Sequence, residues 1–178
     1  MPDRHLGLHL ADEIDGLDSM LDKLADCIAE TWLAELPVPI QFNPNALALK
    51  NAPQLLTGKT IAVAKDRAFC FLYEENLQCL TGMGAKLVFF SPLNDANLPD
   101  ANGVYLPGGY PELYAEQLSK NQQMKKDLRK HLADGKGILA ECGGMVWLLD
   151  VLETDEGKPY LMTGLLSGNA VMQKKLAA

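Results

Sequence analysis

The fold of this protein is decided by the stretch Gly137-Ile138-Leu139-Ala140-Glu141-Cys142-Gly143-Gly144. Its first five residues form a short apolar run that predicts a buried strand, and residues 145–152 predict a helix after it. Almost no residues remain to connect the two elements, so we expect Cys142 on a sharp turn with a strained backbone. Such a turn needs small residues two positions to either side, and Ala140 and Gly144 provide them. Cys142 is therefore a candidate nucleophile.

The helix after Cys142 would make its thiol more reactive. The N-terminal N–H groups of a helix lower the pKa of a nearby thiol and stabilise developing negative charge. The backbone N–H of Gly143 is a candidate oxyanion donor. The alternative is that Cys142 is a small buried residue at a tight turn, as many cysteines are. The other cysteines lack this context: we expect Cys27 and Cys79 in the core on helix faces, and Cys70 in a packed loop.

A second glycine loop, Pro107-Gly108-Gly109-Tyr110-Pro111-Glu112, follows a predicted strand at residues 103–106. Two glycines at a strand end let backbone N–H groups approach a ligand closely, so Gly108 and Gly109 are candidates for the second half of an oxyanion hole. The alternative is an ordinary turn, because Gly-Gly alone is a weak signal. Phosphate binding is not favoured, because the sequence contains neither G-x-x-x-x-G-K-[ST] nor G-x-G-x-x-G.

Strand and helix signals alternate along the chain after residue 58. Apolar runs predict strands, and helical spacing predicts helices, at 60–64, 74–82, 85–90, 103–106, 112–133 and 137–141. Buried strands separated by helices indicate an α/β fold with a mostly parallel sheet and helices on both faces. Ligands bind such sheets at the carboxyl ends of the strands, where both glycine loops lie.

The N-terminal part of the chain has a different pattern. Residues 13–35 carry apolar side chains at helical spacing with acidic residues on the other face, which predicts an amphipathic helix. Residues 36–57 contain several prolines and predict a linker, because proline continues neither a helix nor a central strand. We therefore expect an N-terminal segment, a linker and an α/β domain over residues 58–178.

Composition excludes several kinds of protein. The net charge of -7 argues against nucleic acid or an anionic membrane as the main partner, and the basic run at residues 125–130 predicts a solvated helix face. No apolar stretch approaches the roughly 20 residues that cross a bilayer, and the sequence shows no signal peptide. Four cysteines without a C-x-x-C pair predict a reducing, cytoplasmic environment.

The histidines give neither a metal site nor a convincing base. His5, His9 and His131 are not spaced with cysteines in any zinc pattern, so no metal site is expected. A cysteine nucleophile ordinarily needs a base. We expect His131 as a cap or surface residue near the end of a helix, and His5 and His9 lie in the N-terminal segment. The residues alone indicate a nucleophile with oxyanion donors and no base.

Several motifs together resemble one family. They are Ile61-Ala62-Val63-Ala64-Lys65-Asp66, Ala68-Phe69-Cys70-Phe71, Glu75-Asn76-Leu77, Phe90-Ser91-Pro92-Leu93, Leu98-Pro99-Asp100, Gly108-Gly109-Tyr110-Pro111-Glu112-Leu113 and Ala140-Glu141-Cys142-Gly143-Gly144. Residues 58–178 resemble the glutamine amidotransferase domain of cobyrinic acid a,c-diamide synthases, which act in corrinoid (vitamin B12) biosynthesis. Residues 1–35 resemble the end of the ATP-dependent synthetase domain that precedes it in this family.

The resemblance implies a class I amidotransferase, flavodoxin-like architecture and a defined reaction. Cys142 would attack the side-chain amide of glutamine, with Gly143, Gly108 and Gly109 holding the tetrahedral intermediate. A histidine would protonate the leaving ammonia. The synthetase domain would use ATP and magnesium to activate the a and c carboxylates of a cobyrinate-like tetrapyrrole, and this segment itself would hold no cofactor. A related branch amidates nickel sirohydrochlorin instead, and that acceptor stays open.

The sequence departs from the family in two places. It ends at Ala178 before the C-terminal motif that carries the family's histidine, and it lacks the P-loop of the synthetase half. We therefore expect a truncated domain with little glutaminase turnover by itself, and a homodimer through an exposed sheet edge. Two alternatives remain: another cysteine hydrolase on the same scaffold, and a domain that only binds a partner.

Overall fold

A computed structural model describes residues 9–41 and 53–173. The chain divides into two compact units, residues 1–45 and residues 46–178. The boundary between them falls inside the segment predicted as a linker. Each unit has its own elements and is described separately.

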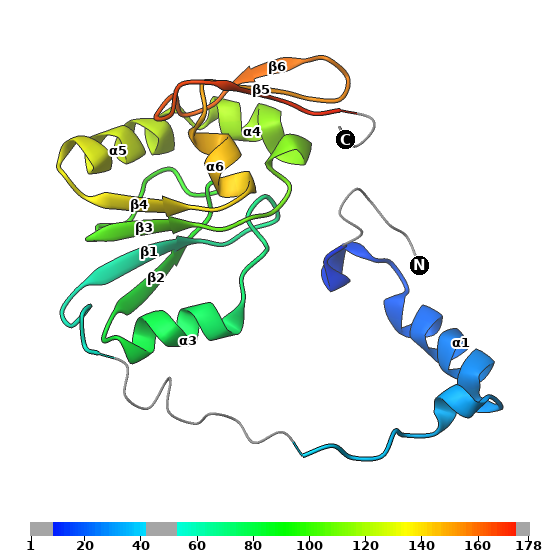
Figure 1. The fold of residues 1–178 in the computed structure, drawn as a ribbon. Helices are drawn as coiled ribbons and strands as arrows, with labels where there is room; N and C mark the ends of the chain where they lie inside the picture. The colour runs from blue at the N-terminus through cyan, green and yellow to red at the C-terminus, as the bar shows by residue number, and fades with distance from the viewer. Residues whose placement is uncertain (1–8, 42–52, 174–178) are drawn as a thin grey trace. The chain divides into compact units, whose positions relative to one another are not determined.

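The second unit is built on a four-stranded parallel sheet, shown in Figure 1. Its order is β2-β1-β3-β4, with β1 at Thr60–Ala64, β2 at Lys86–Phe90, β3 at Gly103–Leu106 and β4 at Gly137–Ala140. All four strands were predicted within one residue of these bounds. The parallel arrangement brings the carboxyl ends of β3 and β4 side by side, so the two glycine loops meet there.

Side chains alternate between the two faces of this sheet, and both faces carry helices (Figure 1). The register aligns Ala62 with Val88 and Val104, whose side chains pack in the main core with the apolar faces of three helices. These helices are α4 at Ala115–Lys120, α5 at Gln122–Ala133 and α6 at Gly143–Leu148. Val63 and Tyr105 point to the opposite face, where α3 at Glu74–Gly82 contributes Leu77. The predicted α/β class with helices on both faces is confirmed.

The single helix predicted over 112–133 is wrong, because the chain breaks it at Asn121. A 3-10 turn, η4 at Pro111–Tyr114, precedes α4, and α5 starts afresh after Asn121. The Asn121 side chain accepts a hydrogen bond from the Met124 N–H and donates to the carbonyls of Pro92 and Asp95. The asparagine is thus a helix cap tied to the loop after β2.

The helix predicted over 145–152 begins earlier and ends earlier, at Gly143 and Leu148. The chain then forms a second, three-stranded sheet that the sequence did not lead us to expect. Its order is β6-β5-β7, with β5 at Val151–Glu153, β6 at Pro159–Leu161 and β7 at Asn169–Val171. Each strand has three residues, which is too short to show a hydrophobic period.

The described part of the first unit is helical. It contains the turn η2 at Ala11–Glu13, the helix α1 at Leu17–Ala29 and the turn η3 at Trp32–Ala34. The helix predicted over 13–35 is therefore shorter, because Gly16 adopts a left-handed conformation before it and Thr31 caps the next turn. None of its side chains is buried. Among the described residues, no helix is both long and apolar enough to span a bilayer.

Candidate active site

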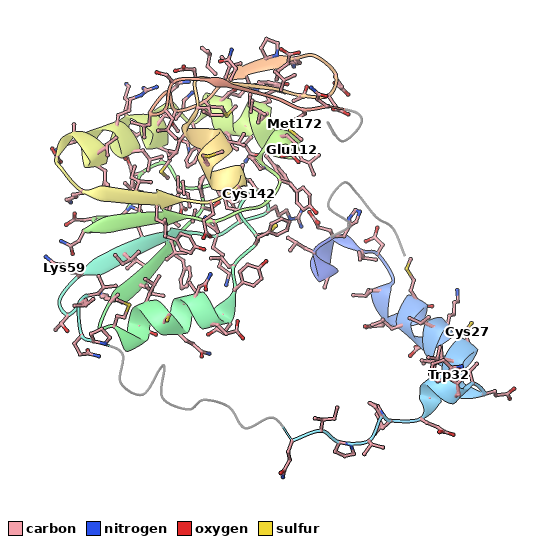
Figure 2. All side chains as sticks on the ribbon, viewed as in Figure 1. Cys27, Trp32, Lys59, Glu112, Cys142 and Met172 are labelled. Carbon is pink, nitrogen blue, oxygen red and sulfur yellow. The ribbon has the colours of Figure 1, made fainter. Side chains whose placement is uncertain are left out.

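Cys142 occupies a strained turn between β4 and α6. Its φ of 45° and ψ of -112° make it the one non-glycine residue with positive φ in the described part of the chain. The Glu141 N–H before it donates to the Leu106 carbonyl, and the Cys142 carbonyl accepts from the Val146 N–H. Figure 2 shows Cys142 at the start of α6, and the residue is exposed to solvent. The strain has the form that a nucleophile elbow requires.

The two glycines after Cys142 permit close packing that any side chain would prevent. A Cβ atom at Gly144 would lie 2.2 Å from the Leu106 carbonyl oxygen. A Cβ atom at Gly143 would lie 2.8 Å from Pro111 Cδ and 3.1 Å from the Gly109 nitrogen. The elbow is therefore pressed against β3 and against the loop that follows it.

The second glycine loop lies directly beside the thiol-bearing residue. A Cβ atom at Gly108 would stand 3.4 Å from Cys142 Cβ and 3.2 Å from Phe71 Cδ2, so Gly108 lies between the nucleophile and that ring. Gly109 has φ of 156°, and a Cβ there would meet the Ala68 carbonyl oxygen at 2.2 Å. The structure thus brings together Cys142, Gly143, Gly108 and Gly109, the four residues singled out from the sequence.

A third segment, residues 66–71, borders the site and was missed by sequence reasoning, which assigned only packing to Cys70. The Phe71 N–H donates to the Gly108 carbonyl at 3.0 Å in an isolated antiparallel bridge. The Tyr110 N–H donates in turn to the Ala68 carbonyl at 3.0 Å. The one available signal was the Ala68–Phe71 motif within the family resemblance, because nothing in its local pattern predicts pairing with residue 108.

Glu141, the residue before the nucleophile, is held by a tyrosine on the neighbouring strand. The Tyr105 hydroxyl donates to Glu141 Oε2 at 2.6 Å. Burial first, and then the hydrogen bond to Glu141, raises the pKa of Tyr105 to about 12. The phenol therefore remains a donor at neutral pH, and the pair fixes β4 to β3 one residue before the elbow.

His131 is not placed to act as a base for Cys142. It lies on α5, and its Nε2 is 3.2 Å from the carbonyl oxygen of Gly137, the first residue of β4. Cys142 lies beyond the other end of this strand. His131 is buried, so its prediction as a surface or cap residue is wrong, and burial lowers its pKa.

The prediction of core positions for Cys27 and Cys79 is wrong as well, since both are exposed. In the described ranges, no three histidine, cysteine, aspartate or glutamate side chains converge as metal ligands would.

Residues 60–178 match the family described as the CobB/CobQ-like glutamine amidotransferase domain. The chain belongs to this family. The match covers both glycine loops, including the one that carries Cys142, and it confirms the resemblance predicted from the motifs.

Curated relatives extend the similarity over the whole chain. Hydrogenobyrinate a,c-diamide synthase from Stutzerimonas stutzeri (strain A1501) is 51% identical over 100% of this chain and 41% of the relative. Cobyrinate a,c-diamide synthase from Herminiimonas arsenicoxydans is 48% identical over 99% of this chain and 41% of the relative. The chain thus spans 41% of the length of these relatives.

A crystal structure of a candidate peptidase E from Listeria monocytogenes EGD-e has a similar fold. It superposes with a TM-score of 0.50 over 62% of this chain and 64% of that protein, at 16% sequence identity. This likeness supports the α/β architecture of the amidotransferase domain and carries no information about its substrate.

Proposed function

We propose that Cys142 hydrolyses the side-chain amide of glutamine, and that the ammonia serves to amidate the a and c carboxylates of a cobyrinate-type tetrapyrrole. Membership of the glutamine amidotransferase family supports the first half. The names of the curated relatives support the second. The observation that carries the proposal is the strained backbone of Cys142 at the N-terminus of α6, directly beside Gly108.

In the proposed reaction, the Cys142 thiolate attacks the side-chain amide carbon of glutamine and a C–S bond forms. The amide oxygen takes up the negative charge, and the N–H groups of Gly143 and Gly109 are the proposed donors to it, with Gly108 leaving room beside the thiol. The C–N bond breaks as the nitrogen gains a proton, and ammonia leaves a thioester. Water then cleaves the thioester, which releases glutamate and restores the thiol.

We assign the proton transfers to a histidine outside this sequence. The family resemblance places the catalytic histidine in a C-terminal motif that these 178 residues do not contain. His131 lies at the opposite end of β4 from Cys142, as described above.

The acceptor half of the reaction is assigned to a separate synthetase domain. Activation of a carboxylate by ATP and magnesium would take place there, because this chain has no G-x-x-x-x-G-K-[ST] stretch. The four free cysteines support a reducing, cytosolic setting for the reaction.

Two other functions compete with this proposal. The fold also suits a peptidase-like cysteine hydrolase, and a non-catalytic binding domain would need no base. Assays of the complete product of the gene separate them. We expect it to release glutamate from glutamine but to leave peptides intact, and we expect Cys142→Ala to abolish the release. Peptide cleavage, the absence of glutamate release from folded protein, or release that survives Cys142→Ala would each contradict the proposal.

A further inference from the structure

One hydrogen bond beside the elbow controls the direction of a peptide group in the site. The Phe71 N–H donates to the Gly108 carbonyl at 3.0 Å. In a trans peptide the carbonyl and the following N–H point in opposite directions. The N–H of Gly109 therefore points away from the Phe71 N–H, and the nitrogen and the carbonyl oxygen of Gly109 both lie beside the elbow, 3.1 and 3.2 Å from where a Cβ of Gly143 would be. The bond to Phe71 thus fixes the direction of the Gly109 N–H beside the elbow.

The hydrogen bond from Phe71 matters because both residues of this peptide are glycines. A Gly-Gly peptide can rotate between two orientations at little steric cost, because neither residue has a Cβ. One orientation presents an N–H to the elbow and the other presents a carbonyl oxygen, which would repel an oxyanion. The hydrogen bond from Phe71 stabilises the orientation with the N–H toward the elbow, because in the other orientation the Gly108 carbonyl would lose the Phe71 N–H as its donor.

The segment that carries Phe71 is itself firmly anchored. Asp66 Oδ1 accepts from the N–H groups of Ala68 and Phe69, and Asp66 Oδ2 accepts from the Ser91 hydroxyl and the Leu93 N–H. Hydrogen bonds to a charged carboxylate are stronger than those between neutral groups. This one side chain therefore fixes the loop after β1 to the loop after β2.

Phe71 also contacts the site through its ring. The ring packs edge-on against Tyr110 with centroids 5.2 Å apart. Its Cδ2 lies 3.2 Å from the place of a Gly108 Cβ, and Cys142 Cβ lies 3.4 Å from the same point. The ring thus stands on one side of Gly108 with the nucleophile close by.

We propose that Phe71 is a positioning residue for the oxyanion hole, which acts by holding the Gly108–Gly109 peptide so that the Gly109 N–H faces the reacting oxygen. The inference rests on the proposed glutaminase function. Asp66 supports Phe71 by anchoring the segment. Neither residue performs a chemical step; both determine whether the second oxyanion donor is present.

The test compares two substitutions at position 71 in the complete gene product. Phe71→Pro and Phe71→Leu both remove the ring, but only proline removes the N–H that holds Gly108. Each variant is assayed for glutamine kcat and KM, for inhibition by glutamate γ-semialdehyde, and for the rate of Cys142 alkylation by iodoacetamide. The thiol adds reversibly to the aldehyde carbon, and the oxygen of that adduct occupies the place of the oxyanion. Alkylation by iodoacetamide needs the thiolate but no oxyanion hole.

We expect Phe71→Pro to lower kcat about 10- to 100-fold relative to Phe71→Leu, less than the roughly 10²- to 10³-fold loss that follows outright removal of an oxyanion-hole donor, because the Gly109 N–H is misplaced but still present. The semialdehyde inhibition constant should rise by the same factor, while KM and the alkylation rate stay within about twofold. Equal kcat and inhibition constants in the two variants would overturn the inference. A fall in alkylation that parallels kcat would overturn it too, because the elbow itself would then be disturbed.

If the Phe71→Pro variant does not fold, Asp66→Asn is a second, milder substitution that tests the same inference. An amide has one acceptor oxygen fewer, so at least one of the four hydrogen bonds is lost. A parallel loss of kcat and semialdehyde affinity at constant alkylation is expected again, and unchanged kcat would overturn the inference. The wild-type protein separates the two proposals: if it neither hydrolyses glutamine nor binds the semialdehyde, the proposed function fails first.

Discussion

At the scale of single residues, the elbow depends on positions that have no room for a side chain. Gly144 is one such position, because its Cβ would lie 2.2 Å from the Leu106 carbonyl oxygen, an atom of the central sheet. Overpacking of a well-packed core, which forces side chains and backbone to shift, typically costs about 1–3 kcal/mol. We expect Gly144→Ala to lower the free energy of unfolding by that amount, measured by urea denaturation.

Gly137→Ala is the matched control for this substitution. Gly137 lies at the start of β4, and a Cβ there would meet no atom within 4 Å. We expect its unfolding free energy to stay within about 0.5 kcal/mol of wild type. Equal losses for the two variants would show that Gly144 is not a packing requirement.

His131 gives a prediction about pH. Burial lowers its pKa in the folded protein below the reference value of 6.5, so between these two pKa values the unfolded chain binds more protons. Its contribution to stability is therefore complete above pH 6.5 and is lost as the pH falls toward the folded pKa, with a slope of at most about 1.4 kcal/mol per pH unit. His131→Gln keeps a donor for the Gly137 carbonyl without titrating. Its stability should vary less with pH in this window, and an unchanged slope would refute the assignment.

At the scale of elements, Asn121 separates α4 from α5. Its side chain caps α5 and also donates to two carbonyls of the loop after β2. Loss of an N-cap costs about 0.5–2 kcal/mol, and unpaired carbonyls add to that cost. We expect Asn121→Ala to lower the free energy of unfolding by about 2 kcal/mol in a urea titration. Gln122→Ala, which removes an exposed bond to the Ser119 carbonyl, should change it by less than about 0.5 kcal/mol; equal effects would contradict the role of Asn121.

The sequence allowed the large elements and both glycine loops to be predicted, for physical reasons visible in those residues. The strands of the central sheet are continuous apolar runs, because both of their faces carry helices. The elbow was predictable because a strand, a cysteine and a helix follow one another with small residues in between.

Other features depend on distant partners and were not predictable from local patterns. The break at Asn121 depends on carbonyls of Pro92 and Asp95. The role of Phe71 depends on a bridge to Gly108, and the hold on Glu141 depends on Tyr105. A periodic pattern indicates which face of a helix or strand is buried, but it does not indicate which distant group a polar atom will bond to.

At the scale of the whole molecule, the sheet face beside α3 is only partly covered. Leu139 on β4 is 59% exposed, and an open cavity of about 600 Å³ lies between α3 and the sheet face formed by β3 and β4. Exposed apolar surface of this kind favours association. The homodimer expected from the sequence stays a prediction. A homodimer predicts a sedimentation coefficient that rises with protein concentration. We expect Leu139→Asp to abolish this rise, whereas Leu161→Asp, a control substitution on exposed β6, should leave it unchanged. A monomer at every concentration would contradict it.

The central claim, that Cys142 is the nucleophile of a glutamine site, is tested most directly by mass spectrometry. The complete gene product is treated with an electrophilic glutamine analogue, beside Cys142→Ser and beside a sample protected with excess glutamine. We predict one adduct, on Cys142, that glutamine blocks and that the serine variant lacks, while exposed Cys27 and Cys79 stay unlabelled. No adduct on folded protein, or an adduct that glutamine does not block, would contradict the claim and leave the elbow as a structural turn or a site for another substrate.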